Sequence, residues 1–102
     1  MLMVIGEVKL ADVAEIDTAR EAIVTMMAAS NAEPGCILYA FSQDIADPCV
    51  LRITEKWQDQ AALDAHFEAP HMAVFMTGLA NAKVESVVTH LYDAKNERPV
   101  LP

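Results

Sequence analysis

Hydrophobic residues alternate with other residues in four segments of the chain, and a period of two residues is typical of β-strands. In the second segment Tyr39 and Phe41 share one side, and in the third Glu55 and Trp57 do. Val, Ile, Thr and aromatic residues, which favour strands, are frequent in all four segments. The predicted strands are residues 2–9, 36–43, 50–57 and 84–92.

Two longer segments follow the period of a helix instead. The first covers residues 12–31, where Asp12 and Glu15 have the spacing of a capping box. The second begins at Asp59, a favourable N-cap, and is broken at Pro70 because proline removes a backbone donor and clashes with the preceding turn. A further helical piece follows this break.

The order of these elements predicts an α+β, ferredoxin-like fold. Strand, helix, two strands, helix and strand form the βαββαβ arrangement, in which helices cover one face of a four-stranded antiparallel sheet. We expect one domain over residues 1–93 and a polar, proline-containing tail over residues 94–102.

The two central strands are predicted to form a hairpin. A turn centred near Ala46 pairs Tyr39 with Ile53 and Ile37 with Glu55, so that the apolar faces of both strands coincide. We assign this shared face to the helices.

The opposite face of the predicted sheet is apolar as well. If Met3 and Ile5 point towards the helices, Leu2, Val4 and Val8 lie on the other side. A sheet with apolar residues on both faces and helices on only one leaves a surface that needs a cover. A second copy of the chain is the simplest cover, and we therefore predict a homodimer.

Composition and charge narrow the possible functions. The chain has 102 residues, enough for a single core, and more than half of them are hydrophobic. Its net charge is −8 and its seven Lys and Arg residues are scattered, so we expect neither nucleic acid nor an anionic membrane surface as a partner. The N-terminal residues do not resemble a signal peptide, and no apolar run reaches the about 20 residues of a membrane span. We expect a cytoplasmic protein.

The middle of the chain carries motifs in a distinctive order. They are Glu33-Pro34-Gly35-Cys36, Tyr39, Asp44, Asp47-Pro48, Glu55-x-Trp57, Ala62-Leu63-x-x-His66 and Pro70-His71. This order resembles that of the antibiotic-biosynthesis monooxygenase-like family, in its quinol monooxygenase branch. This resemblance implies a dimeric α+β barrel. It also implies O2 chemistry on quinols or electron-rich aromatics without flavin, haem or metal. A related haem-degrading branch uses an Asn in the first strand, which residues 2–9 lack.

His66 and Glu55 are the candidate catalytic residues. O2 oxidises the anion of a quinol, so the reaction needs a base, and histidine is suited to that role near neutral pH. His66 is predicted to face the sheet, either as this base or substrate anchor, or as a core histidine bonded to Glu55 or to a carbonyl. Glu55 lies in line with Trp57 and would either orient His66 or make a structural hydrogen bond with the backbone or Tyr39.

Four further residues are candidates for substrate binding. Trp57 and Tyr39 would stack on a flat ring, or belong to the plain core. Phe67 is placed beside them on the second helix. Arg52, on the opposite face of the sheet, would bind an anionic group or form a salt bridge at the dimer interface.

His71 is the last candidate for contact with the substrate. It follows His66 by five residues, and on one continuous helix the two side chains would diverge by about 140°. Because this is not the spacing of a metal-binding pair, we predict no metal site. The family resemblance implies that the protein uses no cofactor.

The leading hypothesis is a cofactor-independent monooxygenase that acts with O2 on a small aromatic or quinol. We expect His66 and Glu55 to project into one small cavity between the sheet and the helices. The alternative is a non-catalytic dimer that binds a small hydrophobic metabolite. A purely structural interaction domain would use the same apolar sheet face.

Overall fold

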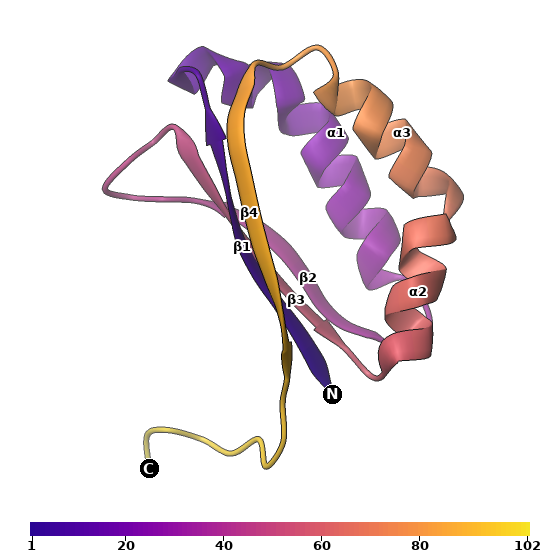
Figure 1. The fold of residues 1–102 in the computed structure, drawn as a ribbon. Coiled ribbons are helices and arrows are strands. Elements are labelled where there is room, and N and C mark those ends of the chain that lie inside the picture. The colour runs from indigo at the N-terminus through magenta and orange to yellow at the C-terminus, as the bar shows by residue number, and fades with distance from the viewer.

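Four antiparallel strands form one sheet in the order β2-β3-β1-β4, and three helices cover one of its faces (Figure 1). The structure, a computed structural model, describes all 102 residues. The predicted α+β, ferredoxin-like fold is confirmed. The elements are β1 (Leu2–Leu10), α1 (Val13–Asn31), β2 (Cys36–Gln43), β3 (Val50–Trp57), α2 (Gln60–Glu68), α3 (Pro70–Leu79) and β4 (Val84–Asp93).

Side chains at the start of α1 fix its position. The Asp12 carboxylate accepts a hydrogen bond from the backbone N–H of Glu15 at 3.2 Å, as a capping residue does. The reciprocal bond of the predicted capping box is absent, because the Glu15 carboxylate accepts the N–H of Lys83 at 3.0 Å. The beginning of α1 is therefore tied to the chain just before β4.

The turn after α1 packs directly on α2. Gly35 has φ +83°, a value that side-chain-bearing residues rarely adopt, and a Cβ there would lie 2.6 Å from the Cβ of Ala62. The carbonyl of Gly35 also accepts the N–H of Gln58 at 2.8 Å. This close approach holds the end of α1 against the start of α2.

The helix-facing side of β1 differs from the prediction. Leu2, Val4 and Val8 are buried beneath the helices, whereas Met3 and Ile5 lie on the open face, so the predicted orientation of this strand is wrong. Both sides of β1 are apolar, and alternation alone could not distinguish them.

The hairpin register also differs from the prediction. Tyr39 pairs with Glu55 rather than with Ile53, so the turn is centred one residue after Ala46. A shift of two residues keeps the same side chains on each face, and Tyr39 and Glu55 still face the helices. Ile37, predicted opposite Glu55, instead lies at a β-bulge and is exposed.

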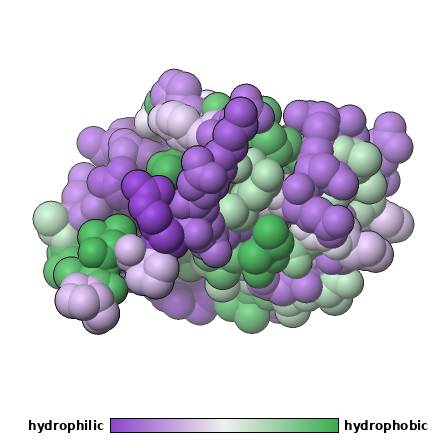
Figure 2. Space-filling model, turned by 90° about the horizontal axis from the view of Figure 1, so that it is seen from below, coloured by the Kyte–Doolittle hydropathy of each residue, from purple (hydrophilic) through white to green (hydrophobic).

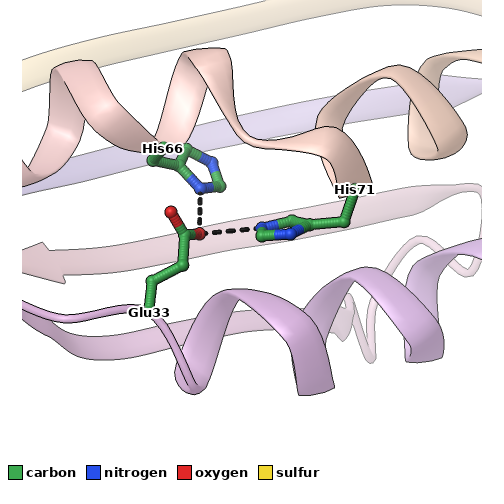
Figure 3. A group of neighbouring side chains, drawn as sticks. All are labelled: Glu33, His66 and His71. Atoms are coloured by element: carbon green, nitrogen blue, oxygen red, sulfur yellow. Dashed lines mark hydrogen bonds and ion pairs between the residues drawn. The ribbon is translucent and has the colours of Figure 1, made fainter.

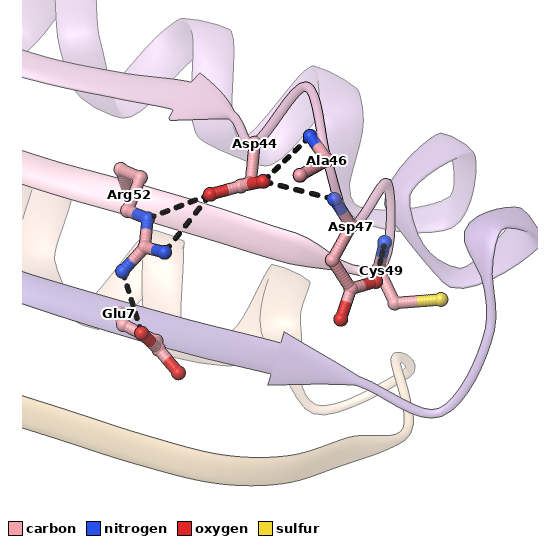
Figure 4. Close-up of polar contacts among 6 residues, drawn as sticks. All are labelled: Glu7, Asp44, Ala46, Asp47, Cys49 and Arg52. Carbon is pink, nitrogen blue, oxygen red and sulfur yellow. Dashed lines mark hydrogen bonds and ion pairs between the residues drawn. The ribbon is translucent and has the colours of Figure 1, made fainter.

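A cluster of charged residues closes this hairpin on the open face (Figure 4). The Asp44 carboxylate accepts the N–H groups of Ala46 and Asp47 and also binds the Arg52 guanidinium at 2.9 Å. These hydrogen bonds, first that of Asp47 and then that of Arg52, lower the pKa of Asp44. Arg52 binds Glu7 on β1 at 2.6 Å as well, and so links two strands.

The open face and the edge strand β4 have no cover. Every residue of β4 is exposed, including several apolar ones. The tail after β4 runs away from the helices in Figure 1, with its first N–H bonded to Met1. Viewed from below, this end of the molecule is mostly hydrophilic with separate apolar patches (Figure 2). None of the helices combines the length and apolar character required to cross a membrane.

Candidate functional site

His66 lies in a buried cluster with one carboxylate and a second histidine (Figure 3). Its Nδ1 is 2.6 Å from Oε2 of Glu33, and Nε2 of His71 is 2.9 Å from the same oxygen. Only 2% of the His66 side chain and 12% of the Glu33 side chain are exposed. Each imidazole therefore donates an N–H to this carboxylate, which can only accept while it is ionised.

Three separate elements bring these residues together. Glu33 follows α1, His66 is in the last turn of α2, and His71 is the second residue of α3. Between the helices Ala69 is extended, with φ −66° and ψ 143°, as expected for a residue before Pro70. The divergence stated for one continuous helix does not apply, because the predicted break at Pro70 redirects the chain and both rings face Glu33.

Aromatic rings enclose His66 on several sides. Its ring centroid is 4.6 Å from that of Trp57 and 5.3 Å from that of Tyr39. Trp57 and Tyr39 are buried, whereas Phe67, at 5.6 Å, is 60% exposed and lies at the outer edge. The structure thus places Trp57, Tyr39, Phe67 and His71 around His66.

Glu55 does not orient His66. Its Oε1 accepts the indole N–H of Trp57 at 2.9 Å, and no hydrogen bond joins it to the imidazole. The carboxylate that bonds His66 is that of Glu33, which sequence reasoning missed as a site residue. The Glu-Pro-Gly motif that contains Glu33 was the available signal, but its contact with His66 spans 33 positions.

Burial raises the pKa of Glu55, and the charge of Glu33 raises it further, while the Trp57 hydrogen bond and His66 oppose the change. The folded state therefore holds the proton of Glu55 more tightly than the unfolded chain. This contribution stabilises the fold below the ordinary carboxyl pKa and is lost as pH rises towards the raised one.

The Glu55→Gln variant should lack this pH dependence, because glutamine keeps the acceptor for Trp57 but does not ionise. We expect the stability of wild type relative to the variant to fall as pH rises from about 4, near the ordinary carboxyl pKa, towards neutral. Urea unfolding of both proteins across this range measures the difference. A constant difference would contradict the prediction.

Tyr39 and Cys36 are poor acid–base groups in this setting. Burial, followed by the charge of Glu55, raises the pKa of the Tyr39 phenol far above its usual range. Burial and then Glu33 raise the pKa of the Cys36 thiol. Both groups remain protonated near neutral pH, which leaves His66 as the group suited to proton transfer.

A partly open apolar cavity of about 190 Å³ lies between the sheet and the helices. Neither His66 nor Glu55 lines it, so the predicted hollow shared by these two residues is not present. The cavity is nevertheless close by, since the ring of Phe41 in its wall is 5.7 Å from that of Tyr39. Its lining is Val8, Leu10, Ala19, Ile23, Phe41, Leu51, Ile53, Phe75, Met76, Leu79, Val84 and Val87.

A second, open groove of about 330 Å³ runs between α1 and α3. His71 lines it, so the groove leads from solvent to the Glu33 cluster. Phe75 lines both the groove and the apolar cavity and forms the wall between them. Arg52, by contrast, lies on the open face of the sheet, and the structure does not bring it to His66.

Comparison with known structures shows how widely this fold occurs. A candidate antibiotic biosynthesis monooxygenase from Deinococcus radiodurans superposes with a TM-score of 0.89 at 24% identity, over 100% of both chains. Another such protein, from Nitrosomonas europaea, superposes with a TM-score of 0.83 at 20% identity, over 92% of this chain and 98% of that chain. A protein from Pseudomonas aeruginosa superposes with a TM-score of 0.81 at 25% identity, over 93% of this chain and 94% of that chain.

Sequence comparison agrees with the fold. An uncharacterised protein from Synechocystis sp. is 38% identical over 52 residues, which cover 51% of this chain and 35% of that relative. The chain therefore spans only about a third of the length of this curated relative. The sequence model of the family described as antibiotic biosynthesis monooxygenase matches residues 1–78. This chain, with its monooxygenase-like domain, belongs to the antibiotic biosynthesis monooxygenase family.

Proposed function

We propose that this protein is a monooxygenase that transfers oxygen from O2 to a small quinol or electron-rich aromatic, with His66 as its base and no cofactor. The observation that carries this proposal is the 2.6 Å hydrogen bond between Nδ1 of His66 and Glu33, in a site enclosed by aromatic rings. Family membership supports the reaction class, and the named residues are the chain's own contribution to it.

The hydrogen bond to Glu33 determines which nitrogen of His66 can act. Because the carboxylate accepts a proton from Nδ1, the neutral ring keeps its lone pair on Nε2. Nε2 makes no hydrogen bond with the protein, and Ser30 Oγ is the only fully buried side-chain polar atom without a partner. Nε2 is therefore the nitrogen that we assign to the phenolic hydroxyl of the substrate.

The reaction begins when Nε2 takes a proton from the quinol. The resulting anion gives one electron to O2, and the semiquinone and superoxide combine to form a ring hydroperoxide, which takes the proton back from His66. Loss of water then leaves a hydroxyquinone. One oxygen atom enters the ring, the other leaves as water, and the quinol supplies all the electrons.

Glu33 and the aromatic side chains support this sequence in different ways. The ionised Glu33 stabilises the imidazolium that forms when His66 takes up the proton. Trp57 and Tyr39 are buried beside His66 and limit the access of water to it. Phe67 and His71 stand at the more exposed edge of the site, where we place further contacts with the substrate.

Oxygen uptake with a panel of hydroquinones tests this proposal. We expect uptake above the protein-free rate for at least one of benzo-, methylbenzo- and naphthohydroquinone, with one atom of labelled O2 in the product by mass spectrometry. Uptake at the protein-free rate for all of them would refute it.

The apolar cavity supports a second candidate function, the binding of a neutral hydrophobic molecule without reaction. All twelve residues that line it are apolar, so a buried hydroxyl of a ligand would have no partner there. A ring hydrocarbon such as toluene should then be bound more tightly than the corresponding phenol. Quenching of Trp57, the only tryptophan, together with absence of oxygen uptake would favour this function.

We further propose that a second copy of the chain covers the open sheet face. Ile5, Val88 and Tyr92 lie together on this face, and each is about half exposed. The Ile5→Glu variant should therefore sediment as a monomer and the wild type as a dimer. Val24→Glu, on the outer side of α1, is the matched control and should remain dimeric. Monomeric wild-type protein would contradict this proposal.

A further inference from the structure

The geometry points to a binding site for a divalent transition-metal ion formed by Glu33, His66 and His71. This inference goes beyond the proposed oxygenation, which needs no metal. Two imidazole nitrogens and one carboxylate oxygen converge here from three elements, with all three atoms within 4.8 Å of one another. The remaining histidine, His90, lies on β4 and is not part of the group.

The donor set indicates which ions would bind. Imidazole nitrogen favours Zn²⁺, Co²⁺, Ni²⁺ and related ions, whereas Mg²⁺ and Ca²⁺ prefer oxygen ligands. Two histidines and one carboxylate supply three ligands and leave further coordination positions open to water. We therefore assign the site to the zinc-like ions and not to Mg²⁺.

The present distances require His71 to move, because the ligand atoms of the cluster lie up to 4.8 Å apart and those around a bound ion are closer together. Ligands that hold an ion at about 2.1 Å lie about 3.0–3.5 Å apart, depending on coordination geometry. The Glu33 oxygen is 2.6 Å from Nδ1 of His66 and 2.9 Å from Nε2 of His71, so these atoms must separate by a few tenths of an ångström. His71 is the most exposed of the three side chains and is the one with room to move.

The site can be reached from solvent, and the negative charge around it favours the approach of a cation. His71 lines the open groove between α1 and α3, so an ion can approach from solvent without crossing the apolar core. Glu21 also lines this groove, and the net charge of the chain is −8, both of which attract cations. Glu33 then provides the charge that partly neutralises a bound ion.

Metal binding and the proposed base activity exclude each other. An ion bound to Nδ1 uses the lone pair of that nitrogen, so the proton of the neutral ring moves to Nε2, which then has no lone pair to accept a proton from a quinol. Zn²⁺ bound here would therefore inhibit the proposed oxygenation, which makes the site regulatory in the context of that function.

Titration of the purified full-length chain with Co²⁺ tests the site without reference to activity. We expect one Co²⁺ per chain, a visible absorption band typical of nitrogen and oxygen ligands, and displacement by Zn²⁺ but not by Mg²⁺. The His71→Ala and Glu33→Gln variants should bind more than tenfold more weakly, and His90→Ala should bind as wild type does. Circular dichroism checks that each variant is folded.

Two results would overturn the assignment. One is equal Co²⁺ affinity in wild type and in folded His71→Ala, and the other is loss of binding in His90→Ala with retention in His71→Ala. Because His71 is partly exposed, this variant should fold even if His66→Ala does not. Since no quinol is present, failure of the metal proposal leaves the oxygenase proposal untouched, and the reverse also holds.

Discussion

Replacing Glu33 by Gln should lower the rate of quinol-dependent oxygen uptake by a factor on the order of 10² or more. Glutamine can still accept the N–H of His66, but it carries no charge to stabilise the imidazolium. Its amide group can also turn an N–H towards the ring and favour the other tautomer. His66→Ala should reduce uptake at least as much, because it removes the base itself. Initial rates on an oxygen electrode measure both effects.

Glu55→Gln is the matched control for this experiment. It makes the same chemical change in a neighbouring buried carboxyl group, whose partner is Trp57 and not His66. We expect its rate to stay within a few-fold of wild type. If Glu55→Gln were as slow as Glu33→Gln, the orienting role assigned to Glu33 would be wrong, and general electrostatics of the site would explain both results.

Trp57→Ala should lower the free energy of unfolding by about 3–5 kcal/mol. Trp57 is fully buried, and its removal leaves a large cavity beside His66. The substitution also takes away the only side-chain donor to Glu55. A buried acceptor without a donor adds its own penalty of about 1–3 kcal/mol, although the two contributions are not strictly additive.

Trp57→Phe separates these two contributions. Phenylalanine refills most of the space but has no N–H, so its effect should be a smaller loss of about 1–3 kcal/mol, mainly from Glu55. Urea unfolding followed by far-UV circular dichroism measures both variants, since the substitutions remove the only tryptophan fluorophore. A loss below about 1 kcal/mol for Trp57→Ala would contradict the central packing role of this side chain.

The fold was predictable because its signals are local. Asp12 and Asp59 cap their helices as expected, Pro70 separates α2 from α3, and alternation located all four strands. The orientation of β1 was not predictable, since both sides of this strand are apolar. The hairpin register failed for a similar reason, because a shift of two residues preserves the hydrophobic pattern.

The site was predicted only in part, because its main contacts are not local. Alternation placed Tyr39, Glu55 and Trp57 on the face that also receives His66. The partner of His66 could not be inferred, since Glu33 approaches it only after the Gly35 turn packs on α2. Residue type suggested a carboxylate for the imidazole, and Glu55 was the nearer candidate in the predicted sheet.

The extended residue between α2 and α3 has a consequence for how this cluster could be lost. Ala69 and Pro70 carry no reactive group, yet the bend they create decides whether the imidazoles of His66 and His71 meet. Substitution of the proline would release its restriction on the preceding residue and allow one uninterrupted helix. A substitution at Pro70 alone would thus separate the two imidazoles, although Glu33, His66 and His71 all remained in the sequence.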